Sequence, residues 1–166
     1  METIYCKKLP RIIKNKKRLE SVLGVKITNR GKEVTISGKP EAEYVAEKVI
    51  DALNFGFPFT AAMQLKEGFV FEIINIKDHT KRKDLERIRG RIIGTGGRTL
   101  KTLHDLIKGN IEIQDNRVGV ICPPENMKLA QEAIVGLVKG AKQGNVYGFL
   151  ERNQVKAIDD LGLKEN

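Results

Sequence analysis

The chain has 166 residues, which is enough for one mid-sized domain or two small ones. Hydrophobic residues make up 40% of it, which excludes disorder by composition, and no segment approaches the roughly 18 apolar residues of a membrane span. The formal net charge of +9 suits a polyanionic partner, whereas aromatic residues are only 5%, so stacking against bases has few rings to use.

The first half of the chain alternates short strand patterns with helix patterns. Alternating apolar residues indicate strands, and apolar residues at intervals of three and four indicate helices. The expected elements are, in order, a strand at residues 3–9, a short helix with Leu19, Val22 and Leu23 on one face, strands around Val25 to Ile27 and Val34 to Ile36, and a helix opened by Pro40.

The second half repeats this order. Arg11-Ile12-Ile13 recurs as Arg91-Ile92-Ile93, 80 residues further along. The expected elements are a strand at residues 69–76, an inserted helix at 82–90, a helix with Leu100, Leu103 and Ile107 on one face, strands at 111–113 and 118–122, and a helix opened by Pro124. Both halves thus indicate strand–helix–helix–strand–strand–helix, and such a repeat argues for two tandem domains.

We therefore expect an α+β protein with two βααββα domains, each a three-stranded sheet with helices on one face. The expected division is a first domain at 1–56, a linker at 57–67, a second domain at 68–151 and a polar C-terminal tail at 152–166. A short helix at 145–151 should close the second domain. Three phenylalanines at 55, 57 and 59 are expected to pack between the domains and hold them together.

The two halves differ most where their first two helices meet. The second half has Gly94-Thr95-Gly96-Gly97, and the first has Lys14-Asn15-Lys16-Lys17 at the matching positions. Glycine permits positive φ and close approach of a ligand to the backbone. Because this loop leads into a helix, its free N–H groups carry partial positive charge and suit a phosphate.

The residues around the glycines fit the same chemistry. Residues 77–101 hold nine Lys or Arg against three acids, a net charge of +6 in one stretch. Ile92, Ile93 and Leu100, with Ile111 or Ile113 from the next strand, could floor an apolar groove beside the loop. Such a groove fits unpaired bases and is too narrow for a duplex.

Other kinds of site find little support. The Walker A string is absent, and the dinucleotide fingerprint would need glycine where Thr99 stands. No carboxylate pair lies near a histidine and no nucleophile has an evident base, so we expect neither an enzyme nor a cofactor. The two cysteines, Cys6 and Cys122, are not at metal-ligand spacing, so we interpret them as core residues in a reducing compartment.

The segment Arg91–Arg98, which reads RIIGTGGR within this element order, resembles the type I K-homology (KH) domain. A first unit without the glycines, an inserted basic helix in the second, and a closing VYGFLE at 146–151 resemble the archaeal relatives of the Dim-two/Krr-one ribosome-assembly proteins, also called the partner-of-Nob-one family. By this resemblance Gly94 and Gly97 fall on the invariant loop glycines, Ile93 falls on the groove residue before them, and Thr95 departs from the Lys or Glu usual in the family.

The residues and the resemblance together predict one main RNA contact and one secondary basic patch. The predicted RNA contacts are Arg89, Arg91, Ile93, Gly94, Thr95, Gly96, Gly97, Arg98, Lys101 and Ile113. The predicted secondary patch is Lys14, Lys16, Lys17, Lys81, Arg82 and Lys83. The first domain is expected to position the second and to add nonspecific charge, with a longer RNA track or a protein-binding face as alternatives.

What the resemblance implies is maturation of the small ribosomal subunit. The partner would be single-stranded pre-rRNA near the 3′ end of the small-subunit rRNA, together with the endonuclease that trims it and other assembly or translation factors, in the cytoplasm. Two alternatives stay open, a protein-interaction scaffold and a general KH-type binder of single-stranded nucleic acid. The 2′-OH contacts that separate RNA from DNA leave no motif.

Overall fold

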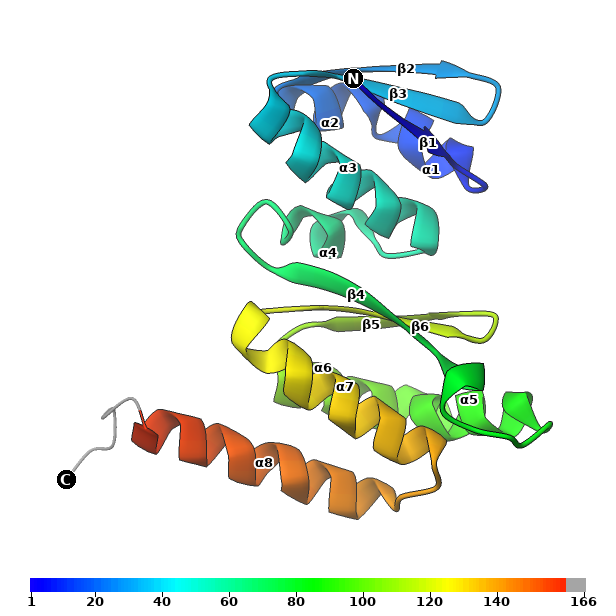
Figure 1. The fold of residues 1–166 in the computed structure, drawn as a ribbon, viewed down its shortest axis with the longest axis vertical. Helices are drawn as coiled ribbons and strands as arrows, with labels where there is room; N and C mark the ends of the chain where they lie inside the picture. The colour runs from blue at the N-terminus through cyan, green and yellow to red at the C-terminus, as the bar shows by residue number, and fades with distance from the viewer. Residues whose placement is uncertain (161–166) are drawn as a thin grey trace. The chain divides into compact units, whose positions relative to one another are not determined.

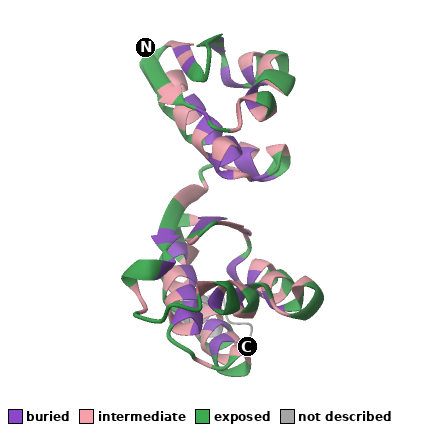
Figure 2. Ribbon diagram, turned by 90° about the vertical axis from the view of Figure 1, so that its right-hand side faces the viewer, coloured by how far each residue is buried: buried purple, intermediate pink, exposed green. Residues whose placement is uncertain are grey.

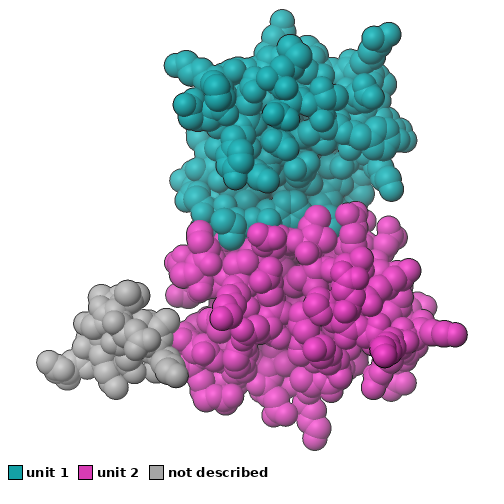
Figure 3. Space-filling model, in the orientation of Figure 1, with its two compact units in different colours: residues 1–71 teal, residues 72–166 magenta. Residues whose placement is uncertain are grey.

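The computed structural model describes residues 1–160, with side chains described through residue 154. The chain divides into two compact units, Met1–Phe71 and Glu72–Asn166 (Figures 1 and 3). Each unit has a three-stranded sheet with helices on one face (Figure 1). The α+β class and the strand–helix–helix–strand–strand–helix order that the sequence predicts are confirmed in both halves.

The first unit contains the first repeat and one further short helix. Its elements are β1 (Glu2–Tyr5), α1 (Leu9–Lys14), α2 (Lys16–Leu23), β2 (Val25–Arg30), β3 (Glu33–Gly38), α3 (Pro40–Phe55) and α4 (Phe59–Met63). The sheet order is β1-β3-β2, with both pairs antiparallel. Val25 and Ile27 on β2 and Val34 and Ile36 on β3 are buried in alternation, so one face of the sheet meets the helices.

The second unit contains the second repeat and a long closing helix. Its elements are β4 (Val70–Asn75), the 3₁₀ turn η1 (Ile76–Asp78), α5 (Leu85–Ile93), the 3₁₀ turn η2 (Thr95–Gly97), α6 (Arg98–Ile107), β5 (Asn110–Gln114), β6 (Arg117–Cys122), α7 (Pro124–Val138) and α8 (Gln143–Asp160). The sheet order is β4-β6-β5, and β5 and β6 are antiparallel. Figure 2 shows that buried residues occur in both units, each around its own sheet and helices.

Several boundaries differ from the expected ones for local reasons. β1 ends at Tyr5 rather than at residue 9, because Tyr5 pairs with Glu33, which is the first residue of its partner strand β3. Cys6 still donates its N–H to the Lys32 carbonyl, and Pro10 then lies in the first turn of α1. The inserted helix α5 starts at Leu85, three residues later than expected, so the basic residues 81–83 precede it instead of forming its first turn.

The segment 57–67, expected as a linker, instead belongs to the first unit and contains α4. Its aromatic residues explain why it is not extended. Phe57 is fully buried, and its ring centroid lies 5.8 Å from that of Phe55 and 5.5 Å from that of Phe71, while Arg18 covers the ring of Phe59. These rings thus add to the first unit's own core. That they also hold the two domains together stays a prediction.

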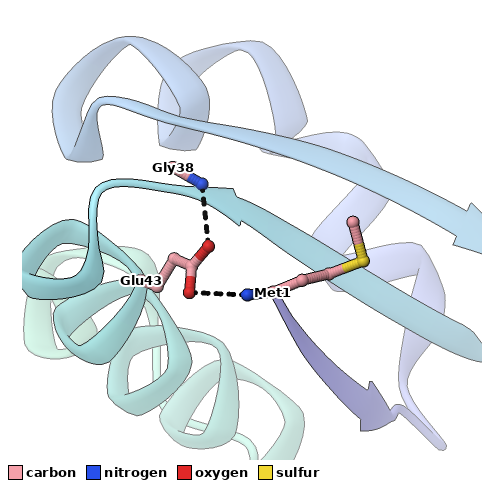
Figure 4. A network of polar contacts seen from close by, with 3 residues as sticks. All are labelled: Met1, Gly38 and Glu43. Atoms are coloured by element: carbon pink, nitrogen blue, oxygen red, sulfur yellow. Dashed lines mark hydrogen bonds and ion pairs between the residues drawn. The ribbon is translucent and has the colours of Figure 1, made fainter.

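The first turn of α3 is tied to the sheet by one carboxylate. Glu43 accepts a hydrogen bond from the Gly38 amide at the end of β3 and another from the Met1 amino group, both close to 3 Å (Figure 4). The Met1 amino group and the hydrogen bonds lower the pKa of Glu43, and the Glu43 carboxylate raises the pKa of the amino group. Glu43 thereby joins Met1 and the end of β3 to the start of α3.

The closing helix is longer than the expected 145–151. α8 runs from Gln143 to Asp160 and packs on α6 and α7, with Val146 and Leu150 buried. The expected tail at 152–166 therefore begins inside a helix, and its last six residues lie outside the described part of the chain. No helix among the described residues is both long and apolar enough to cross a membrane.

Candidate nucleic-acid interface

The glycine loop joins the two helices that carry most of the candidate residues. α5 ends at Ile93, the loop passes through η2, and α6 begins at Arg98. Gly94, Gly96 and Gly97 have φ of 77°, 60° and 77°, all in the left-handed region. Side chains with a Cβ are disfavoured there, so the sequence needs glycine at each position for the loop to take this path.

The glycines differ in what lies in front of them. A Cβ built on Gly94 would lie 2.2 Å from the Thr99 hydroxyl oxygen, so Gly94 is required by packing as well as by φ. A Cβ on Gly96 or Gly97 would meet nothing within 4 Å. The backbone at these two positions is therefore open to an approaching ligand.

The start of α6 gives the open backbone its charge. Gly97 is the N-cap residue and has no side chain to occupy the amides of the first turn, although the Arg98 amide already donates to the Thr95 carbonyl, as the Gly97 amide does to the Gly94 carbonyl. Those amides carry the positive end of the helix dipole, and the exposed side chains of Arg98 and Lys101 add two full charges. An anion with several acceptor oxygens, such as a phosphate, suits this arrangement.

Apolar side chains border the loop on the sheet side. Ile93 keeps 38% of its surface exposed at the end of α5, and Leu100 and Ile113 are half-buried. β5 is an edge strand that packs on α6 and runs back along it, which brings its later residues, including Ile113, toward the start of the helix. Ile92 and Ile111 are buried in the core. Ile93, Leu100 and Ile113 are therefore the accessible members of the expected groove.

His104 fixes α6 against the edge strand. Its Nε2 lies 2.9 Å from the Ile111 amide nitrogen, from which it accepts a hydrogen bond. It is also 3.2 Å from the Ile111 carbonyl oxygen. This structural use agrees with the half-buried position of the ring.

Two of the predicted contacts, Arg89 and Arg91, have guanidinium groups that are engaged with the protein itself. Arg91 donates to the Leu137 carbonyl at 2.9 Å and to the Ala141 carbonyl, and so ties α5 to the connection between α7 and α8. Arg89 donates to the side chain of Asn116 in the β5–β6 turn. Both arginines are half-buried, so they position the loop-bearing helix within the unit.

The repeat carries the same arginine in the first unit. Arg11 occupies the position of Arg91 and donates from Nη2 to the Phe57 carbonyl, which follows α3, at 2.7 Å. In both halves an arginine on the first helix thus holds the chain just beyond the last helix of the repeat. Nothing in the sequence pattern separates such an arginine from one that contacts a ligand, because both lie beside the loop.

The matching connection in the first unit has a different backbone. Asn15 joins α1 to α2 with φ of −105°, and its side chain donates to the Arg11 carbonyl. Lys14 and Lys17 are exposed and Lys16 is half-buried. Without left-handed residues or bare backbone, this connection offers side-chain charge only. The six residues of the predicted secondary patch fall in both units, since Lys81, Arg82 and Lys83 belong to the second.

The cysteines are core residues. Cys6 and Cys122 are fully buried and unpaired, and desolvation raises the pKa of their thiols to about 11 and about 12. Among the described residues, no group of three or more His, Cys, Asp or Glu side chains is placed to hold a metal ion.

The sequence is similar to that of known KH-domain proteins. A family model described as a eukaryotic type KH domain (KH-domain type I), for the second KH domain of PNO1, matches residues 70–155. A KH domain-containing protein of Methanocaldococcus jannaschii is 32% identical over 149 residues, which are 85% of this chain and 66% of that protein. The pre-rRNA-processing protein pno1 of Emericella nidulans is 32% identical over 111 residues, which are 64% of this chain and 43% of that protein. The chain thus spans about two fifths to two thirds of the length of these relatives.

Solved structures agree with the sequence matches. The crystal structure of Dim2p from Pyrococcus horikoshii matches with a TM-score of 0.83 and 31% identity, covering 91% of this chain and 98% of that one. A chain in the a/eIF2alpha-aDim2p-rRNA complex of the same organism matches with the same TM-score and identity, covering 93% and 94%. The likeness extends over both units.

Proposed function

This chain belongs to the PNO1 family of KH-domain proteins, and from that premise we propose that it binds single-stranded RNA and acts in the maturation of the small ribosomal subunit. Its RNA partner is small-subunit rRNA or its precursor, contacted near the 3′ end. The contact is made by the second unit, and the chain works without catalysis of its own. Related proteins named for pre-rRNA processing and a relative solved in complex with rRNA support this proposal.

The observation that carries the proposal is the open, left-handed glycine backbone at the start of α6. The open backbone at Gly96 and Gly97 and the positive end of the α6 dipole receive backbone phosphates, and Arg98 and Lys101 add charge beside them. The bases turn toward Ile93 and Ile113, where contact with aliphatic side chains takes the place of stacking on aromatic rings. Thr95 is exposed and contributes backbone contact. Arg89 and Arg91 serve by holding α5 in place.

The first unit has a different task. Its connection at residues 14–17 offers lysine side chains without bare backbone, so it adds nonspecific charge and cannot clamp a phosphate in the manner of the second unit. Tyr5, Ile13, Val22 and Tyr44 are exposed large hydrophobic residues on this unit. They favour a second role as a protein-binding face, toward the endonuclease that trims the rRNA or another assembly or translation factor in the cytoplasm.

Crosslinking in the cell that makes the protein, followed by sequencing of the bound strand, tests the proposal. We expect recovered sequences to come from the 3′ region of small-subunit rRNA. Recovery of diverse messenger RNAs would overturn the assembly role and leave a general RNA binder. A parallel binding assay with RNA and single-stranded DNA of the same sequence separates the two nucleic acids, and equal affinity for both would count against rRNA as the dedicated partner.

A further inference from the structure

A second basic feature of the second unit lies away from the glycine loop. A surface hollow of about 600 Å³ opens where the connection from β4 to α5 meets the connection from α7 to α8, two segments that lie at the same end of this unit (Figure 1). It is lined by Arg82, Lys83, Asp84, Arg87, Arg91 and Gly140, and we call it the Arg82 hollow.

The charge of the Arg82 hollow is not compensated within the protein. Four of its six lining residues are cationic and one is acidic. The side chains of Arg82, Lys83 and Arg87 are exposed, and the structure shows no ion pair for them among the described residues. Asp84 is the N-cap residue of α5, and its side chain makes no capping hydrogen bond. Three unpaired cations gathered around one concavity favour an anion as the occupant.

Hydrogen bonds hold the floor of the hollow. Arg91 is held by the carbonyls of Leu137 and Ala141 on both sides of Gly140. Gly140 has φ of 103°, which side chains with a Cβ rarely adopt. Arg82 Nη2 lies 3.9 Å from where a Cβ of Gly140 would be, so the guanidinium lies over bare backbone. An anion bound here would meet charged groups on a preorganised surface.

The chemistry of the lining favours a phosphate over a protein partner. Protein interfaces need a desolvated apolar core, and the exposed large hydrophobic residues of the described second unit, Ile73 and Ile93, do not line the hollow. Guanidinium groups such as those of Arg82 and Arg87 present paired donors that match phosphate oxygens. The first turn of α5 adds the positive end of its dipole.

The position of the hollow sets which RNA can reach it. Asp84 and Gly94 are the caps at opposite ends of α5, and at 1.5 Å per residue they are about 15 Å apart. A KH groove holds about four nucleotides at the glycine loop. A strand confined to that groove would therefore not reach the Arg82 hollow, whereas a longer strand leaving the groove along α5 would.

We infer that the Arg82 hollow binds a backbone phosphate of the RNA strand beyond the nucleotides held at the glycine loop, and so lengthens the binding site along α5. This inference rests on the proposed function, because it assumes that RNA occupies the loop. A second hollow, lined in part by Lys77, Lys81 and Lys139, lies next to it and continues the basic surface.

The test measures how removing charge from the hollow changes the affinity of the full chain for short and for extended RNAs. The variant is Arg82→Gln with Arg87→Gln, and the matched control is Lys128→Gln with Arg152→Gln, which removes two exposed charges of the same unit outside the hollow. The probes are a labelled RNA of about four nucleotides that copies the small-subunit rRNA 3′ end, and two forms of it extended by several nucleotides at the 5′ or the 3′ end. Unfolding temperatures confirm that each variant is folded.

We expect the Arg82/Arg87 variant to bind the short RNA like the parent and to lose about three- to tenfold in affinity for one extended RNA. Its salt dependence for that RNA should be shallower by about 0.7 per lost phosphate contact. Equal affinity of variant and parent for both extended RNAs overturns the inference, as does an equal loss for short and extended RNA or the same loss in the control. Failure of the parent to bind any of the RNAs contradicts the proposed function instead.

Discussion

Replacing Gly97 by aspartate and, separately, by asparagine tests whether a phosphate lies against the glycine loop. The two side chains have the same shape and differ by one negative charge. Gly97 has φ of 77°, and a Cβ there would meet nothing within 4 Å, so both side chains start in open space. The left-handed backbone costs a residue with a Cβ about 1–2 kcal/mol, with Asn and Asp among the better tolerated, and both variants share this cost.

The difference between the two variants therefore reports the charge alone. A carboxylate on Gly97 and a phosphate on the amides at the start of α6 would be about 5 Å apart, which gives a repulsion of about 0.8 kcal/mol at the dielectric constant of water and about 3 kcal/mol at an effective value near 20. We expect Gly97→Asp to bind single-stranded RNA roughly 4- to 250-fold more weakly than Gly97→Asn at low salt.

Fluorescence anisotropy with a labelled single-stranded RNA, measured over a range of salt concentrations, gives both affinities, and thermal unfolding shows whether the variants are equally stable. The gap between them should narrow as salt is raised, because the repulsion is screened. Equal affinities of the Asp and Asn variants at every salt concentration would refute a phosphate at this loop. Loss of binding in both variants alike would place the importance of Gly97 in backbone geometry rather than in phosphate contact.

Four further predictions concern residues with distinct roles. Arg91→Gln should lower the free energy of unfolding by about 1–3 kcal/mol, because two carbonyls lose a charged donor, and should leave unchanged the salt slope for a short RNA held at the glycine loop. Arg98→Gln should do the reverse, lowering that slope by about 0.7 while the unfolding temperature stays the same. Glu43→Gln should lower the unfolding temperature at neutral pH. The difference from the parent should vanish as acid protonates Glu43, whose pKa is lowered in the folded state, and should shrink again above the raised pKa of the Met1 amino group. A difference in unfolding temperature that does not depend on pH would contradict the ion pair. Cys122, whose pKa burial raises to about 12, should react with a thiol reagent at pH 8 only as fast as the chain unfolds, and rapid reaction of the native protein would contradict its burial.

The element order of both repeats follows from the sequence because apolar periodicity is a local property. Val25, Ile27, Val34 and Ile36 alternate in the sequence and are buried in alternation in the structure. The folding of residues 57–67 into the first unit was not predictable in the same way. It depends on contacts of Phe57 with Phe71, a residue that the sequence assigned to the next strand.

The glycine loop is a similar case of partial prediction. The glycines and the nearby charges are visible in the sequence, and their positive φ values and open faces agree with it. The different roles of the arginines cannot be predicted from the sequence. Arg91 and Arg98 both flank the loop, yet the half-buried Arg91 bonds to carbonyls that lie 46 and 50 residues away, while Arg98 is exposed. Only the fold reveals such partners.

The most direct test of the central claim is a map of backbone amide shifts by NMR as a short single-stranded RNA is added to the full chain. We predict that the largest changes occur at residues 94–101, with Ile113 beside them, and that the Lys14–Lys17 connection changes little. Changes confined to the first unit, with the amides of the glycine loop unmoved at saturation, would contradict the claim that this loop is the RNA-binding site.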